Sequence, residues 1–477
     1  MLMKNWLLSF SLLIASLQLA ATTHEVGPDK TYPNPNALYT ANVVAAGDTI
    51  LIDAADYRGR DALAVWSPDN LTIKGVGGQP KLYADGQYIW GKGIWVARGN
   101  NITVENIAFH DAAVPDRNGA GIRLDGNGLT VRHCLFRNNE NGILTNNTEA
   151  GHVRVEFSEF DGAGFGDGQS HNIYVGRIDS FTFYGSWSHR ANVGHQIKSR
   201  AKYNNIRYSR IEDDGGSSSR LIDLPNGGRS YVVGCLLVQG ANAQNGNLVG
   251  YGLEGYRAGY ERGLFVSHNT LVTYRNRGSF FHIREGADST LVVNNILAGP
   301  GTLVIGELTD TAGTIKNDNL GMFAFTDPDA GDYSLSREPS LAYDAGMDLN
   351  VYADDRLIPL ASYIDHLSIK ERTVAGSAPD VGAFEVAATL SFYVDLLGEP
   401  VSIYPNPSTG QVWLKNLQLP LETSIEVIAI SGKGMVLKQP WTGELNLSHL
   451  PSGKYLLRWE TPTGKAYISR LSLFTKH

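Results

Sequence analysis

Short runs of alternating apolar and polar residues recur along most of the chain. Eight copies share one phrase, in which an alternating run is followed by Asn or another small residue and then by a second apolar pair. The phrase reads ITVENIAF at residues 102–109, LTVRHCLF at 129–136, VRVEFSEF at 153–160, FTFYGSWS at 181–188, NNIRYSRI at 204–211, SYVVGCLL at 230–237, LFVSHNTL at 264–271 and TLVVNNIL at 290–297. A two-residue alternation predicts β-strands, so each copy is expected to form strands joined by a bend.

The spacing of these copies predicts a solenoid. Their central apolar residues are Val104, Val131, Val155, Phe183, Ile206, Val232, Val266 and Val292, which lie 27, 24, 28, 23, 26, 34 and 26 residues apart. A repeat of this length, with Asn and Gly at the bends, is typical of β-solenoids, in which stacked coils share one interior. Leucine-rich repeats need an L-x-x-L-x-L frame, which is absent, and a propeller blade needs about 40 residues. We therefore expect an all-β protein with ten or eleven coils.

The repeat resembles right-handed parallel β-helix proteins, the architecture of pectate-lyase-like enzymes. The phrase DVGAFE at residues 380–385 resembles the closing phrase of many bacterial members. The resemblance implies a right-handed parallel β-helix over residues 23–386, and it supplies a fold without a reaction. In this register Cys134 and Cys235 occupy the same position four coils apart. Strand stacking then separates them by about 19 Å, too far for a disulfide, so both are predicted to be buried thiols.

The two ends of the chain carry predicted targeting segments. Lys4 precedes an apolar stretch at residues 6–19 that is too short to span a bilayer comfortably, and small residues follow it. Residues 1–22 are therefore predicted to be a secretory signal peptide, with an N-terminal membrane anchor as the alternative.

The repeat stops near residue 386, and residues 387–400 are a predicted linker. Residues 401–477 contain seven predicted short strands separated by Pro, Gly and Ser turns, which favours a small β-sandwich. YPNPSTG at 404–410 and LSHLPSGKY at 447–455 resemble the C-terminal sorting domain of the type IX secretion system of Gram-negative bacteria. This resemblance implies export through the periplasm by the type IX machinery, followed by release or attachment to the outer cell surface. An immunoglobulin-like carbohydrate-binding appendage is the alternative.

The charge balance and the absence of several motifs limit which partners and cofactors are expected. The chain has 40 basic and 48 acidic residues and no basic run, so no nucleic-acid partner is expected. No phosphate-binding loop, HExxH motif or CxxC cluster is present. The sequence therefore predicts neither a cofactor nor a set of metal ligands. We also expect the protein to be a monomer. Ca²⁺ at Asp213–Asp214 is left open, although EDDGGSSS more simply forms a turn.

A second set of strands, midway between the repeated phrases, is predicted to gather polar residues on one face. Its inward residues are Ile122, Ile143, Ile173, Ile197 and Ile222. The residue after each should face outward, which gives the row Arg123, Leu144, Tyr174, Lys198 and Asp223. Tyr251 and His282 are expected to continue this row, with an ambiguous register after Gly250. Arg200 lies two residues beyond Lys198 and should face the same way.

The row suits β-elimination from a uronate, which needs a cation, a base and a proton donor. We assign Lys198 as the base, Tyr174 as the proton donor, Arg200 as the clamp on the uronate carboxylate, and Asp223 as the orienter of Lys198 or a metal ligand. The candidate substrate-binding residues are Arg123, His171, His195, Tyr251, Glu254, His282 and Arg284. His171 and His195 are expected to face inward or lie at a bend. The alternative for the whole row is a solvated face with ordinary cross-strand ion pairs.

The absence of two sets of motifs reduces the number of candidate reactions. The N-T-D and G-H-G phrases of polygalacturonase-type hydrolases and the D-P-H-D phrase of alginate epimerases are absent, so inverting hydrolysis by paired carboxylates is not supported. Two hypotheses remain. The first is a secreted polysaccharide lyase acting on an anionic, uronate-containing polysaccharide. The second is a non-catalytic surface β-helix that binds glycan or mediates attachment.

Overall fold

A computed structural model describes residues 21–336, 340–365, 367–386, 402–406, 408–415, 424–429, 434–460 and 466–473. The chain divides into two compact units, Met1–Ala387 and Ala388–His477. The predicted linker lies outside the described residues, as does the predicted signal peptide up to residue 20.

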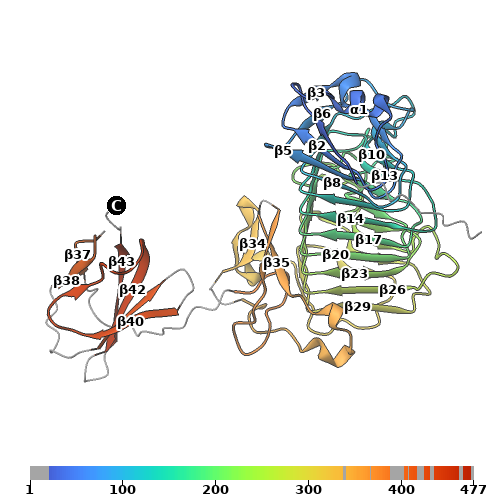
Figure 1. Ribbon diagram of the computed structural model, residues 1–477. Helices are drawn as coiled ribbons and strands as arrows, with labels where there is room; N and C mark the ends of the chain where they lie inside the picture. Colours follow the sequence, from blue (N-terminus) through green and yellow to red (C-terminus); the bar gives the residue numbers. More distant parts are fainter. Residues whose placement is uncertain are drawn as a thin grey trace, which may run out of the picture. The chain divides into compact units, whose positions relative to one another are not determined.

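The described part of the first unit is a parallel β-solenoid built from three sheets (Figure 1). Sheet A contains β1 (Thr23–Val26), β2 (Thr49–Asp53), β5 (Thr72–Val76), β8 (Ile102–Glu105), β11 (Leu129–Arg132), β14 (His152–Glu156), β17 (Ser180–Tyr184), β20 (Tyr203–Arg207), β23 (Arg229–Val233), β26 (Gly263–Ser267) and β29 (Ser289–Val293). Sheet B contains β3 (Asp56–Arg58), β6 (Lys81–Tyr83), β9 (Ala108–His110), β12 (Leu135–Arg137), β15 (Glu159–Asp161), β18 (Trp187–His189), β21 (Arg210–Glu212), β24 (Leu236–Gln239), β27 (Thr270–Thr273), β30 (Ile296–Ala298) and β32 (Ile315–Asn317). Sheet C contains β4 (Ala64–Trp66), β7 (Gly93–Ala97), β10 (Ala120–Leu124), β13 (Asn141–Thr145), β16 (Ile173–Val175), β19 (Ile197–Ser199), β22 (Ile222–Leu224), β25 (Asn247–Tyr251), β28 (Ser279–Ile283) and β31 (Thr302–Ile305). Each complete coil contributes one strand to each sheet, so the predicted parallel β-helix is confirmed.

The predicted repeat register is confirmed in sheet A. Val104 pairs with Val131 in parallel, and every later pair of anchor residues, down to Val266 with Val292, is also in register. All eight anchors are buried in the interior of the solenoid. The apolar half of the alternation therefore forms one continuous core.

The bend between sheets A and B follows one rule in successive coils. Its first residue has a positive φ, at 56° for Asn106, 57° for Gly185 and 54° for Asn294. From the coil of β11 onward, the residue after it is Cys134, Ser158, Ser186, Ser209, Cys235, Asn269 or Asn295. These side chains form an internal column. For example, the Ser158 hydroxyl accepts from the Cys134 N–H at 3.1 Å, and Asn295 Oδ1 accepts from the Asn269 N–H at 2.9 Å. Small polar residues at the bend thus satisfy backbone donors that the sheets leave unpaired.

The N-terminal end of the solenoid interior is covered by a helix. At the N-terminal end, α1 (Pro35–Ala41) starts at Asn34, whose side chain accepts from the Ala37 N–H at 2.8 Å, and its Leu38 is buried in the core. The short helix η1 (Gly59–Ala62) packs beside it.

The described residues between 320 and 386 fold back onto the outer faces of sheets A and B. Their elements are η2 (Leu320–Phe323), β33 (Phe325–Asp327), η3 (Pro328–Ala330), β34 (Asp332–Leu335), η4 (Leu349–Tyr352), η5 (Asp355–Leu357), β35 (Ala361–Ile364) and β36 (Ser368–Glu371). Phe323 packs with Leu236 and Ile296 of sheet B, and Leu349 packs with Tyr231 of sheet A. The closing phrase is fixed by Arg372, which lies 2.8 Å from the Glu385 carboxylate. Sheet C therefore presents the outer face that this segment does not cover.

The described part of the second unit contains two antiparallel sheets. One consists of β37 (Ser402–Tyr404), β38 (Gln411–Lys415) and β41 (Leu445–Asn446); the other consists of β39 (Ser424–Ala429), β40 (Gly434–Pro440), β42 (Gly453–Glu460) and β43 (Ala466–Leu473). Val412 and Leu445 from the first sheet share a core with Val427, Leu457 and Leu471 from the second. The predicted small β-sandwich is therefore confirmed.

Candidate functional site

The outer face of sheet C carries the predicted polar row. Tyr174 pairs with Lys198, and Lys198 pairs with Asp223, on the adjacent strands β16, β19 and β22. The isoleucines before them, from Ile122 to Ile222, are in register and buried. An inward isoleucine column thus aims the next residue of each strand outward.

The four predicted catalytic residues converge with Glu254, a predicted substrate-binding residue in the connection between β25 and β26. Lys198 Nζ donates to Glu254 Oε1 at 2.9 Å and lies 3.6 Å from Asp223 Oδ2. Arg200 Nη2 donates to Glu254 Oε2 at 2.6 Å, and Arg200 Nε donates to the Tyr174 hydroxyl at 3.1 Å. We call Tyr174, Lys198, Arg200, Asp223 and Glu254 the sheet C cluster.

Asp223 forms the buried base of this cluster. Its Oδ1 accepts from Arg220 Nη1 at 3.2 Å, while its Oδ2 lies 3.6 Å from both Lys198 Nζ and His195 Nε2. With Arg220 included, three cationic side chains face two carboxylates, so the group carries a formal excess of one positive charge. An excess of positive charge at a partly buried site favours anionic ligands.

Charge pairing also sets the ionisation of two members. Burial opposes the charge of Arg200, but its hydrogen bonds to Tyr174 and Glu254 outweigh burial and raise the pKa of the guanidinium. Burial likewise opposes the charge of Glu254, but Lys198 and Arg200 outweigh it and lower the pKa of the carboxyl group. Both side chains are therefore charged at neutral pH.

The histidines His171 and His195 form a buried ladder beneath the cluster. Their rings stack with centroids 4.9 Å apart. His171 Nδ1 accepts from the His195 N–H, and His195 Nδ1 accepts from the Arg220 N–H, each at 3.0 Å. Burial, reinforced by the neighbouring cations, holds the pKa of His171 well below its ordinary value. Burial lowers the pKa of His195 to about 4, although Asp223 opposes this. The two rings are thus neutral and support the backbone, in keeping with their expected inward position.

A cavity of about 400 Å³ lies beside Tyr174 on the same face. Its lining includes Arg123, Asn118, Asn146, Gln169 and Tyr174. Arg123 donates to Asp125 Oδ1 at 3.0 Å and also to Asn146. Arg123 therefore lies in this cavity, two strand positions from Tyr174.

The expected position of Tyr251 in the outward row is wrong. Gly250 pairs with Asp223 and with His282, whereas Tyr251 pairs with Leu224 and points into the core, where it is fully buried. A Cβ at Gly250 would lie 2.9 Å from Asp223 Oδ1 and 2.8 Å from Arg220 Cδ, so the glycine makes room for this ion pair. The burial of Tyr251 removes it from the surface.

His282 and Arg284 lie at the far end of the row. His282 continues the row, half-buried, with its Nδ1 3.3 Å from Asn247 Oδ1, and burial lowers its pKa. Arg284 is exposed, and its carbonyl oxygen accepts from the Tyr256 hydroxyl at 2.6 Å.

The two carboxylates at Asp213–Asp214 have different surroundings. Asp213 is buried and accepts from the Ser218 hydroxyl and from the Gly240 N–H, and burial raises its pKa to about 7. Asp214 is exposed, has a φ of 45° and faces His189. The segment therefore forms a turn with one buried and one exposed carboxylate. The oxygens of Asp213 already accept hydrogen bonds, which disfavours Ca²⁺ binding there.

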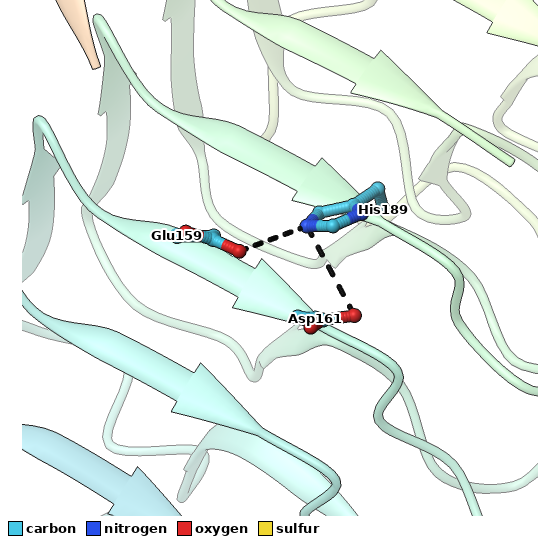
Figure 2. A group of neighbouring side chains, drawn as sticks. All are labelled: Glu159, Asp161 and His189. Carbon is cyan, nitrogen blue, oxygen red and sulfur yellow. Dashed lines mark hydrogen bonds and ion pairs between the residues drawn. The ribbon is translucent and has the colours of Figure 1, made fainter. Parts of the chain in front are cut away.

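A second cluster, on sheet B, is not among the residues predicted from the sequence. Glu159, Asp161 and His189 bring one ligand atom each to within 4.8 Å of one another (Figure 2). His189 Nε2 lies 3.2 Å from Glu159 Oε1. However, Arg190 donates to both oxygens of Asp161 at 2.8 Å, and Arg137 donates to it as well at 2.8 Å. These guanidinium groups already neutralise the carboxylate, so they disfavour a metal ion.

The signal for the sheet B cluster was present in the sequence. EFD at 159–161 and WSH at 187–189 follow the bend in the repeated phrase. The pairing of Asp161 with His189 follows from the same register that aligned sheet C. Aligning this third strand would have placed the residues together.

Residues 402–471 match the family described as the secretion system C-terminal sorting domain. No curated protein and no solved structure matches the chain. None of the helices in the described part of the chain reaches the length and apolarity that a membrane crossing requires. The sorting domain implies export through the type IX machinery, to the medium or the outer cell surface.

Proposed function

We propose that this secreted β-helix protein is a polysaccharide lyase that cleaves an anionic, uronate-containing polysaccharide by β-elimination at the sheet C cluster. The observation that carries this proposal is the convergence of Lys198 Nζ and Arg200 Nη2 on one carboxylate, at 2.9 and 2.6 Å. Paired cations of this kind recognise a carboxylate with defined geometry.

β-Elimination needs three groups around the uronate. A base takes the proton from C5, a C4–C5 double bond forms as the C4–O bond breaks, and the departing oxygen receives a proton. Arg200 neutralises the uronate carboxylate, which acidifies the C5 proton, and Lys198 acts as the base. Tyr174 accepts a hydrogen bond from Arg200 Nε, so its own hydroxyl proton is available for the leaving oxygen. Asp223, held by Arg220, orients Lys198.

The polymer has room on the same face. The cavity beside Tyr174 offers the amides of Asn118, Asn146 and Gln169 and the guanidinium of Arg123. Such groups hydrogen-bond sugar hydroxyls.

The test is incubation of the full-length protein with polygalacturonate, alginate and glucuronate-containing polymers while the ultraviolet absorbance of the unsaturated product is recorded. Lys198→Arg keeps the positive charge but removes a usable base, so cleavage should fall by roughly 10²–10⁴-fold while binding is retained. Arg154→Lys is the matched control, because Arg154 pairs with Glu156 on the outer face of sheet A. Wild-type cleavage by Lys198→Arg, or no product from any polymer, would reject the assignment.

One observation favours a second function, non-catalytic glycan binding. Lys198 Nζ lies 2.9 Å from Glu254 and 3.6 Å from Asp223, a position that suits the binding of carboxylates. Under this alternative, uronate polymers bind to the protein without any unsaturated product, and Lys198→Ala weakens that binding.

A further inference from the structure

Glu254 differs from the rest of the sheet C cluster in its exposure. Its side chain is 45% exposed, whereas those of Lys198 and Arg200 are only 13% and 15% exposed. The two cations therefore lie deeper than the carboxylate that joins them, and Glu254 reaches them from the solvent side.

The carboxylate of Glu254 makes the contacts that an external carboxylate would make. One oxygen accepts from Lys198 Nζ and the other from Arg200 Nη2. A uronate has the same charge and the same two oxygen atoms, so it fits this pair of donors only if Glu254 has left.

The connection that carries Glu254 is held in place by contacts that do not involve this side chain. Asn226 Nδ2 donates to the Gly255 carbonyl at 3.0 Å, and the Tyr260 hydroxyl donates to the Arg200 carbonyl at 3.2 Å. Arg257 Nη2 donates to Glu149 Oε1 at 2.9 Å. The side chain of Glu254 can thus rotate into solvent while the backbone around it stays anchored.

The partners of Glu254 also tolerate its departure. Lys198 keeps Asp223, and Arg200 keeps Tyr174 and the Asn226 side-chain oxygen, which it reaches at 2.7 Å. The donors released by Glu254 are therefore still positioned, with their charge available to a new carboxylate.

We infer that Glu254 is a built-in competitor, which occupies the carboxylate subsite of the sheet C cluster until a uronate displaces it. The inference rests on the proposed uronate specificity and adds the regulation of that site. Neutral sugars do not displace Glu254, so the residue selects for acidic polymers.

The test measures binding of short oligogalacturonates, oligomannuronates and glucuronate-containing oligosaccharides to the full-length protein by calorimetry, with carboxyl-reduced oligosaccharides as neutral probes. Glu254→Gln keeps the shape and removes the competing charge, so the Kd for an acidic probe should fall roughly tenfold. The Kd for the neutral probe should not change. Glu261→Gln is the matched control, because Glu261 lies in the same connection, pairs with Arg229 at 2.8 Å and is 65% exposed.

Each outcome decides the inference. Tighter acidic binding in Glu254→Gln alone supports it, whereas equal tightening in Glu261→Gln would assign the effect to general charge and overturn it. Unchanged or weaker binding in Glu254→Gln, or no acidic binding by either protein, would also overturn it. Cleavage is recorded separately. Tighter binding without cleavage by the wild type would reject the lyase reaction and leave the competitor role standing.

Discussion

At one position of the coil, different residue types accept the same hydrogen bond from a backbone N–H. Asn141, His171 and His195 each lie two residues before an inward isoleucine of sheet C. Each offers one side-chain acceptor to a backbone N–H in the next coil: that of His171, His195 or Arg220. What the position requires is an acceptor, and asparagine or neutral histidine supplies it. Protonation of a histidine nitrogen would instead remove the acceptor.

This column predicts a specific loss of stability in acid. The pKa of His195 is lowered to about 4 in the folded protein, against 6.5 when unperturbed. As pH falls between these values, the unfolded state binds the proton first, so stability is present above pH 6.5 and is lost towards pH 4. The shift corresponds to roughly 3 kcal/mol. In His195→Asn this part of the pH dependence should disappear, as measured by urea unfolding at pH 7 and at pH 4.5.

The control for this prediction is His133→Asn, at an exposed position with a φ of 52° that asparagine adopts readily. It should retain the pH dependence of the wild type. A His195→Asn protein that loses stability in acid as steeply as the wild type would contradict the prediction.

At the scale of the strands, stacked phenylalanines dominate one part of the interior. The ring of Phe136 stacks between Phe109 and Phe160, with centroids 5.0 and 4.6 Å away. A Cβ at Gly121 would lie 2.8 Å from Phe136, so the glycine in sheet C leaves the space that the ring fills.

Phe136→Ala should lower the free energy of unfolding of the solenoid by about 3–5 kcal/mol, because it removes buried contacts and leaves a cavity. Thermal unfolding followed by circular dichroism would measure this. Leu135→Ala, on the outward side of the same strand, should cost about 1 kcal/mol or less. Equal losses in the two variants would show that the stack does not carry this stability.

The alternation in the sequence predicts strand register well and connections poorly. The anchors of sheet A and the isoleucines of sheet C pair as predicted because the period of two leaves one choice of inward face. The prediction for Tyr251 was wrong because Gly250 occupies the outward position that pairs with Asp223. A glycine has no side chain whose polarity could mark this position as outward in the sequence.

The contact of Glu254 with Lys198 lay beyond the reach of the pattern. The two residues are 56 positions apart. They meet because residues 252–262 turn back over the earlier coils, and this turn depends on anchors such as Asn226 and Tyr260 rather than on any period. The strands place Tyr174, Lys198 and Asp223, and the connections decide what covers them.

At the scale of the whole molecule, the C-terminal sorting domain implies export of the attached solenoid. The match over residues 402–471 predicts that deletion of residues 401–477 traps the protein in the periplasm. Cell fractionation and immunoblotting of the native host would measure the distribution. Deletion of residues 368–371, which form β36, is a control for folding defects, since it leaves the sorting domain intact. Unchanged appearance of the truncated protein outside the cell would contradict the prediction.

The coil is also a unit of inheritance. Each coil adds one strand to every sheet and about 4.8 Å to the solenoid, and its interior contacts repeat from coil to coil. Duplication of one coil near β4 would lengthen the protein and leave every contact of the sheet C cluster in place. Duplication of a coil between β16 and β19 would insert an extra strand between Tyr174 and Arg200, which now lie on neighbouring strands, and would break their hydrogen bond. The length of this solenoid can therefore drift in evolution on either side of the cluster, whereas the four coils that carry Tyr174 to Glu254 must be inherited as one block.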